Sequence, residues 1–98
     1  MLTSKQRAYL RSLAHDLPTI MQVGKGGLGD NMLKTFSDAL EARELIKLTV
    51  LENSGENPKE LLQVLAAQLG AEPVAATGRK IVLYRASTKK PTIELPRA

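Results

Sequence analysis

The sequence predicts a single α/β domain (α+β in the broader sense) with elements in the order α-β-α-β-α-β-β. Its 98 residues suffice for one hydrophobic core and leave little room for a second lobe. Three stretches carry apolar residues at helical spacing, and four short stretches are expected to form strands, two of them flanking a Gly-Arg turn. Because the last two strands form a hairpin, we expect a four-stranded mixed sheet with helices packed against it.

The first helix is expected to begin near Ser4, because Thr3 and Gln6 have the T-x-x-Q spacing of a capping box. Its apolar stripe consists of Tyr9, Leu10, Leu13 and Ala14. Pro18 ends this helix, and residues 19–23 are expected to form the first strand.

The second helix follows a glycine-rich segment, with Gly29 or Asp30 as its N-cap. Its apolar positions are Met32, Leu33, Phe36, Ala39 and Leu40. Residues 45–51 alternate in polarity and contain Leu, Ile, Thr and Val, which predicts the second strand.

The third helix has the clearest start signal in the chain. Asn57 is a good N-cap, Pro58 suits the first helical position and Glu60 occupies the third. The buried side is expected to consist of Leu61, Leu62, Leu65 and Leu69. Gly70 is a typical residue for the end of a helix.

The last two strands are expected at residues 73–77 and 81–85, joined by Gly78 and Arg79. Glycine in the first position of such a pair favours a two-residue type II′ turn. These strands complete a domain that spans residues 1–85.

Residues 86–98 form a basic, proline-containing tail, which we expect to pack back on the domain through Ile93 and Leu95.

The distribution of charge favours a basic face that binds a polyanion. The net charge is +4 and the pI is about 9.6. Residues 1–11 contain three basic side chains and no acid, and residues 78–98 have a local charge of +5. Residues 48–77 have a local charge of −3. Charge alone leaves open both nucleic-acid binding and an ordinary basic domain.

The composition gives no support for catalysis. The chain has no cysteine, and its single histidine, His15, has no companion ligand or nucleophile, so capping or packing is its expected role. Glu41 and Glu44 are expected to be solvated at the end of a helix. We therefore expect no enzyme, no metal, no cofactor and no small-molecule substrate.

The expected context is cytoplasmic and monomeric, with no membrane association. The N-terminal sequence lacks the apolar segment of a secretory signal, and no apolar run approaches the length of a membrane span. No stripe typical of a coiled coil or an obligate dimer is present.

The glycine-rich segment allows a dinucleotide-binding interpretation. Gly24, Gly26 and Gly29 have the spacing G-x-G-x-x-G, and Glu52 follows at about the distance of a ribose-binding acid. The four expected strands and the final hairpin argue against this interpretation, because a dinucleotide fold normally uses six strands and another crossover helix.

The same segment also contains G-x-x-G, from Gly24 to Gly27. Glycine lets the backbone approach a phosphate closely, and the amides of a following helix add positive charge. Lys25 adds a full charge at the tip of the loop. A tight turn without a ligand remains an alternative.

Five segments resemble the bacterial stand-alone CRM domain (chloroplast RNA splicing and ribosome maturation) over nearly the whole chain. They are LTSKQRAYLRSLAH at 2–15, VGKGGL at 23–28, ALEARELIKL at 39–48, GRKIVLYR at 78–85 and IELP at 93–96. The resemblance implies a fold similar to the C-terminal domain of bacterial translation initiation factor three. It also implies RNA binding through the G-x-x-G loop, and association with precursors of the large ribosomal subunit.

The expected RNA-binding residues combine the resemblance with the distribution of basic side chains. They are Gly24, Lys25, Gly26, Gly27, Leu28, Lys5, Arg7, Arg11, Arg79, Lys80 and Arg85. The chain departs from the family pattern at Arg43, which keeps the positive charge of this position. It also departs at Pro18-Thr19 and at Gly29, which leaves open the geometry at the start of the loop and its cap. The alternative function is a ribosome-associated module that docks on protein and binds naked RNA weakly.

Overall fold

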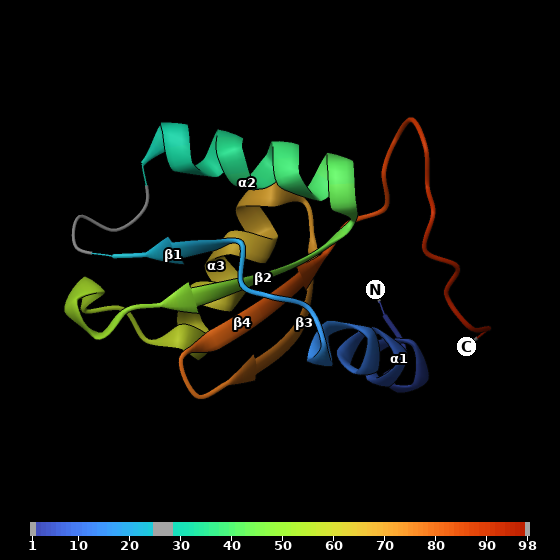
Figure 1. Ribbon diagram of the computed structural model, residues 1–98, viewed down its shortest axis with the longest axis horizontal. Coiled ribbons are helices and arrows are strands. Elements are labelled where there is room, and N and C mark those ends of the chain that lie inside the picture. The colour runs from blue at the N-terminus through green and yellow to red at the C-terminus, as the bar shows by residue number, and fades with distance from the viewer. Residues whose placement is uncertain (1, 25–28, 98) are drawn as a thin grey trace.

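The computed structural model describes residues 2–24 and 29–97, and it confirms the predicted order of elements (Figure 1). The helices are α1 (Ser4–His15), α2 (Asp30–Arg43) and α3 (Pro58–Leu69). The strands are β1 (Met21–Val23), β2 (Leu45–Val50), β3 (Glu72–Thr77) and β4 (Lys80–Tyr84). A short 3-10 helix, η1 (Glu52–Ser54), follows β2.

The four strands form one mixed sheet, as predicted, and their order in it is β1-β2-β4-β3. β1 is parallel to β2, whereas β4 is antiparallel to both of its neighbours. β3 is an edge strand and therefore tolerates Pro73, which has no N–H to donate. Next to this proline the pairing with β4 shifts, so that Val74 is the extra residue of a β-bulge.

The predicted helix starts are confirmed by the caps. The Thr3 hydroxyl accepts from the Gln6 N–H, and the Gln6 side chain accepts from the Thr3 N–H, both at 3.1 Å. The Asn57 side chain accepts from two N–H groups of the first turn of α3, at 3.0 and 3.2 Å. Gly70 ends α3 with a φ of +62°, in the left-handed region that glycine adopts without strain.

The hairpin between β3 and β4 has the expected two-residue turn, with Thr77 opposite Lys80. Gly78 has a φ of +59°, and Arg79 is not among the described residues with positive φ. This combination is the one that a type II′ turn requires.

The first strand begins at Met21, two residues later than predicted.

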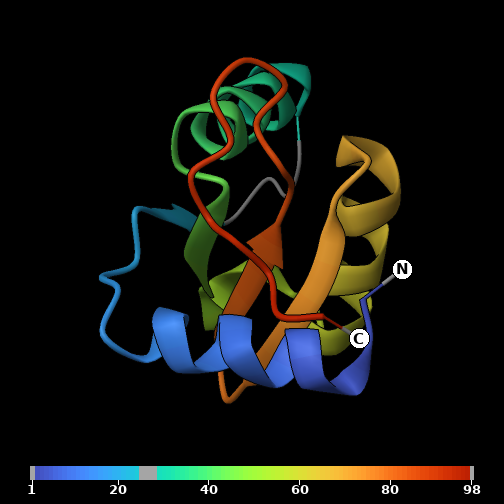
Figure 2. The ribbon, with the colours of Figure 1, turned by 90° about the vertical axis from the view of Figure 1, so that its right-hand side faces the viewer.

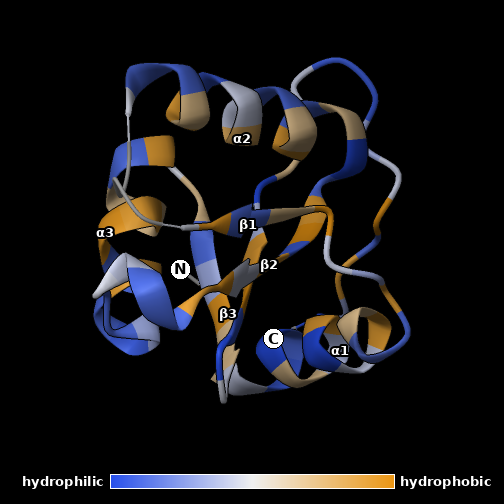
Figure 3. Ribbon diagram, turned by 60° about the vertical axis from the view of Figure 1, so that its left-hand side comes forward, coloured by the Kyte–Doolittle hydropathy of each residue, from blue (hydrophilic) through white to orange (hydrophobic). Residues whose placement is uncertain are grey.

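The sheet separates two hydrophobic clusters. α2 and α3 cover one face, where Phe36, Leu48 and Leu65 are fully buried. α1 crosses the other face and buries Leu10 and Ala14 against β2, β3 and β4 (Figure 2). Hydropathy follows this arrangement, since the apolar positions of α2 turn toward the sheet (Figure 3).

The buried side of α1 is narrower than the predicted apolar stripe of four residues. Tyr9 and Leu13 are each 38% exposed, and only Leu10 and Ala14 are buried. The reason is that α1 contacts the sheet along a single line of side chains.

Among the residues described, no helix has the length and apolar character needed to cross a membrane.

The segment after β4 runs from the end of α2 to α1 (Figure 2). Ile93 and Leu95 pack against the cluster under α1, and the Gln6 Nε2 donates to the Pro96 carbonyl at 3.0 Å. This segment, residues 86–97, is called the tail below.

The expectation that Glu44 is solvated is wrong, because the tail covers it. Glu44 is 1% exposed, and its carboxylate accepts from the N–H groups of Ser87, Thr92 and Ile93 at 2.7 to 2.9 Å. The hydroxyl of Thr92 adds a fourth bond at 2.8 Å. Glu41, one turn earlier, accepts from the hydroxyl of Ser87 and from the backbone that follows it. The two carboxylates therefore fix the tail to α2.

Candidate nucleic-acid interface

Four of the five loop residues expected at the interface, Lys25, Gly26, Gly27 and Leu28, lie outside the described residues. Gly24 is described, and its φ is not positive. A Cβ at Gly24 would meet the Leu51 Cδ1 at 3.5 Å, an ordinary van der Waals contact. Neither the backbone angle nor the surrounding space therefore requires glycine at this position.

Arg79 braces the backbone beside the start of this loop. Its Nε donates to the Val50 carbonyl at 2.7 Å, and its Nη2 donates to the Leu51 carbonyl at 2.9 Å. The Leu51 N–H in turn donates to the Val23 carbonyl at 2.8 Å, directly before Gly24. The guanidinium thus satisfies carbonyls at the end of β2, and it orients the turn against which the loop begins.

Arg85 joins three elements on the other side of the molecule. Its Nη1 donates to the Leu69 carbonyl at 2.9 Å and to the Ser37 hydroxyl at 3.1 Å. Its Nη2 donates to the Ser37 carbonyl at 2.7 Å. The side chain therefore links the end of β4 to α2 and to the last turn of α3, whose carbonyls lack partners within the helix.

Replacing Arg85 with alanine should lower the free energy of unfolding by about 2 kcal/mol, because half-buried carbonyls lose charge-assisted donors. Urea unfolding at neutral pH measures the change. Lys90→Ala, which removes an exposed side chain of the same charge, is the control and should leave the midpoint unchanged. A midpoint for Arg85→Ala equal to that of the control would contradict the bracing role.

The other four basic residues expected at the interface are exposed. They are Lys5, Arg7, Arg11 and Lys80. Within the part of the chain that the structure describes, no hydrogen bond or ion pair engages their side-chain nitrogens. Arg7, Arg11 and His15 are four residues apart on α1, so they form one row along the helix. Lys5 lies away from this row.

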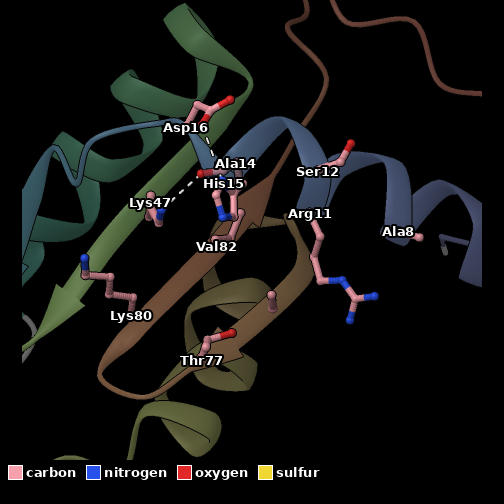
Figure 4. A pocket seen from close by; sticks show the side chains of 11 residues that line it. Ala8, Arg11, Ser12, Ala14, His15, Asp16, Lys47, Thr77, Lys80 and Val82 are labelled. Carbon is pink, nitrogen blue, oxygen red and sulfur yellow. Dashed lines mark hydrogen bonds and ion pairs between the residues drawn. The ribbon is translucent and has the colours of Figure 1, made fainter.

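An open groove of about 650 Å³ lies between α1 and the sheet (Figure 4). Arg11 reaches it from the helix and Lys80 from β4, so the structure brings these two predicted residues together. Lys47 also lines it, but the Lys47 Nζ donates to the Ala14 and Leu17 carbonyls at 3.0 and 3.2 Å. Lys47 therefore closes the C-terminal end of α1.

A second hollow of about 390 Å³ adjoins the groove along β3, and Ala75 lines both. Arg7 and Lys59 contribute basic side chains to this second hollow. Nothing in the sequence marks Lys59 or Ala75 as residues that line a surface hollow.

The prediction that His15 packs or caps is wrong as far as packing is concerned. The side chain is 87% exposed, and its Nδ1 lies 3.3 Å from the Oδ1 of Asp16. A contact between two such exposed side chains contributes little to stability. His15 lines the groove together with Arg11.

Within the described residues, no cluster of three or more His, Asp or Glu side chains could hold a metal ion.

The sequence and the fold both have close counterparts among known proteins. The CRS1 / YhbY (CRM) domain matches residues 2–85. "Probable RNA-binding protein YqeI" of Bacillus subtilis is 49% identical over 96 residues, which cover 98% of this chain and 100% of that protein. An "RNA-binding protein" of Haemophilus influenzae is 33% identical over 98% of this chain and 96% of its own length.

The solution structure of the hypothetical protein SAV1595 from Staphylococcus aureus superposes with a TM-score of 0.78. That protein is 46% identical, and the match covers 98% of this chain and 100% of the other. The family match extends from the residue before the first cap to the end of the final hairpin. The chain therefore belongs to the CRS1/YhbY (CRM) domain family.

Proposed function

We propose that this protein binds RNA, and that it does so on precursors of the large ribosomal subunit. The observation that carries RNA binding is membership of the CRM family, together with relatives that are named as RNA-binding proteins over nearly their whole length. The ribosomal target rests on the resemblance to stand-alone bacterial CRM domains alone.

The exposed basic side chains support this proposal physically. Arg7, Arg11 and Lys80 are available to phosphates, because no described residue engages their nitrogens. Contacts of this kind fix the protein on the RNA backbone without selecting bases. We therefore expect recognition to depend mainly on the shape and backbone of the RNA.

The G-x-x-G loop is proposed as a second element of the interface. The fold does not require a glycine at Gly24, which leaves close approach of a ligand as a reason for one. Lys25 would supply the charge at this loop, and the Gly29 N-cap has no side chain that competes for the first N–H groups of α2.

Replacing Lys25 with alanine should weaken binding to naked ribosomal RNA fragments and flatten its salt dependence by less than about one unit. For wild type, contacts with about five phosphates predict a slope near −3.5, so that tripling the salt weakens binding about fifty-fold. Fluorescence anisotropy across a salt series measures both quantities. Lys90→Ala, in the tail, is the control. An unchanged slope for Lys25→Ala would remove this side chain from the set of contacts.

A specific observation favours protein docking as the second candidate. Tyr9 and Leu13 lie four residues apart on α1 and are each 38% exposed, and Leu17, after the end of the helix, is 36% exposed and lines a hollow together with Leu13. An exposed apolar row of this kind is typical of a surface that contacts another protein. If wild type and Lys25→Ala fail to bind naked RNA at low salt but both sediment with large-subunit particles, docking on protein replaces RNA binding.

A further inference from the structure

We infer that the groove between α1 and the sheet holds an unpaired stretch of RNA, with a nucleoside on its apolar floor and phosphates at its basic rim. This inference rests on the proposed function, RNA binding, and deepens it. It assigns the form of RNA, single-stranded, and its place on the protein.

The floor of the groove is apolar and made of short side chains. Ala14 is 2% exposed and Val82 is 5% exposed, and Ala75 lies beside them on β3. The bulge at Val74 is the reason that Ala75 is available, because it places both residues on the face that α1 crosses. None of these three side chains is longer than valine, so they leave open the space above them.

The rim of the groove is basic on two opposite sides. Arg11 projects from α1 and Lys80 projects from β4, with Thr77 between them on β3 (Figure 4). Lys47 carries a further positive charge at the end of α1. Among the described residues that line the groove, Asp16 is the one acid, and it lies next to His15. The local balance therefore favours an anion.

An apolar floor under a basic rim matches an unpaired nucleotide better than a duplex. A duplex presents phosphates and ribose to a protein and hides the faces of its bases. An unpaired nucleotide offers both an apolar face and a phosphate, and the groove volume of about 650 Å³ lies in the range of small-molecule sites. Along β3 the strand would continue past Ala75 to Arg7 and Lys59 in the second hollow.

Filling the groove without changing its charge tests the inference. Ala75→Leu and Thr77→Leu each add bulk at the groove, and Ala67→Leu adds it on the exposed side of α3 as the matched control. The probe is a single-stranded RNA of about eight nucleotides, compared with a duplex that contains the same sequence. We expect each filled variant to bind the single strand about tenfold more weakly, with the salt slope and the duplex affinity unchanged.

Nitrogen-15 spectra of wild type locate the ligand, since the amides of Ala75, Thr77 and Val82 should shift on addition of the single strand. Thr77 is exposed at the end of β3, so its variant remains informative if Ala75→Leu disturbs the bulge. Single-strand affinity equal to wild type in Thr77→Leu, or equal losses for both forms of RNA, overturns the inference and leaves RNA binding intact. Failure of wild type to bind either form of RNA overturns the proposed function as well.

Discussion

Replacing Glu44 with glutamine should lower the free energy of unfolding by about 3 kcal/mol at neutral pH. For a domain of this size, the midpoint of thermal unfolding should then fall by roughly 12 °C or more. Differential scanning calorimetry of the two proteins measures both changes.

The reason is the environment of the Glu44 carboxylate. It is 1% exposed and accepts four hydrogen bonds, three of them from N–H groups of the tail. Glutamine keeps the shape of the side chain but replaces one acceptor with a donor that faces other donors. Because Oε1 accepts three of the four bonds and Oε2 accepts only from the Ser87 N–H, the new amide nitrogen would face Ser87. The Ser87 N–H would then be buried without an acceptor, which costs far more than losing an exposed contact.

The same carboxylate predicts the response to acid. Burial alone would raise the pKa of Glu44, but the N–H groups of Ser87, Thr92 and Ile93 outweigh it and lower the pKa from 4.5 to about 2. A lowered pKa means that the unfolded chain binds the extra proton first. The stabilisation is therefore complete above about pH 4.5 and is lost as the pH falls toward about 2. Glu44→Gln should flatten this part of the stability profile.

Glu41→Gln is the matched control, because Glu41 lies three residues earlier, in the last turn of α2. The hydroxyl of Ser87 contributes most to lowering the pKa of Glu41 to about 2, followed by the hydroxyl and N–H of Thr88. Because Glu41 is partly exposed, water can replace these bonds, and we expect a much smaller fall in the unfolding midpoint. Equal midpoints for Glu44→Gln and wild type would show that the tail does not stabilise the fold.

The elements that the sequence predicted well are those with local signals. The capping box at Thr3, the Asn57-Pro58 start of α3 and the Gly78-Arg79 turn all depend on residues within four positions of one another. Such signals act through backbone geometry and nearby hydrogen bonds, so they do not require knowledge of the fold. The mixed sheet followed from the order of these elements.

The groups that the sequence did not place depend on distant partners. Glu44 bonds to residues 43 to 49 positions later, and Arg85 bonds to Ser37, 48 positions earlier. Sequence alone shows only that these residues are charged, and it cannot distinguish a solvated charge from one that braces the backbone. The groove floor was missed for the same reason, since the role of Ala75 depends on a bulge and on a helix that begins about seventy residues earlier.

Removing Arg7, Arg11 and Lys80 together should weaken RNA binding about a hundredfold at about 0.1 M salt. Arg11 and Lys80 line the groove, from α1 and β4, and Arg7 lines the hollow that adjoins it. Each phosphate contact with single-stranded RNA contributes about 0.7 to the salt slope, so the triple alanine variant should have a slope flatter by about two units. All three residues are exposed, so the variant should unfold at nearly the wild-type midpoint.

Net charge must be separated from position, and the chain offers a control that does so. Alanine at Arg43, Lys89 and Lys90 also takes the net charge from +4 to +1, but these exposed residues lie at the end of α2 and in the tail. Long-range attraction to a polyanion depends on net charge and should fall equally in both variants. Counterion release requires contact with the RNA. Only the variant without Arg7, Arg11 and Lys80 should therefore have a flatter salt slope. If the salt slope and the RNA affinity fall equally in both variants, Arg7, Arg11 and Lys80 contribute only to the net charge. The interface would then lie elsewhere on the molecule.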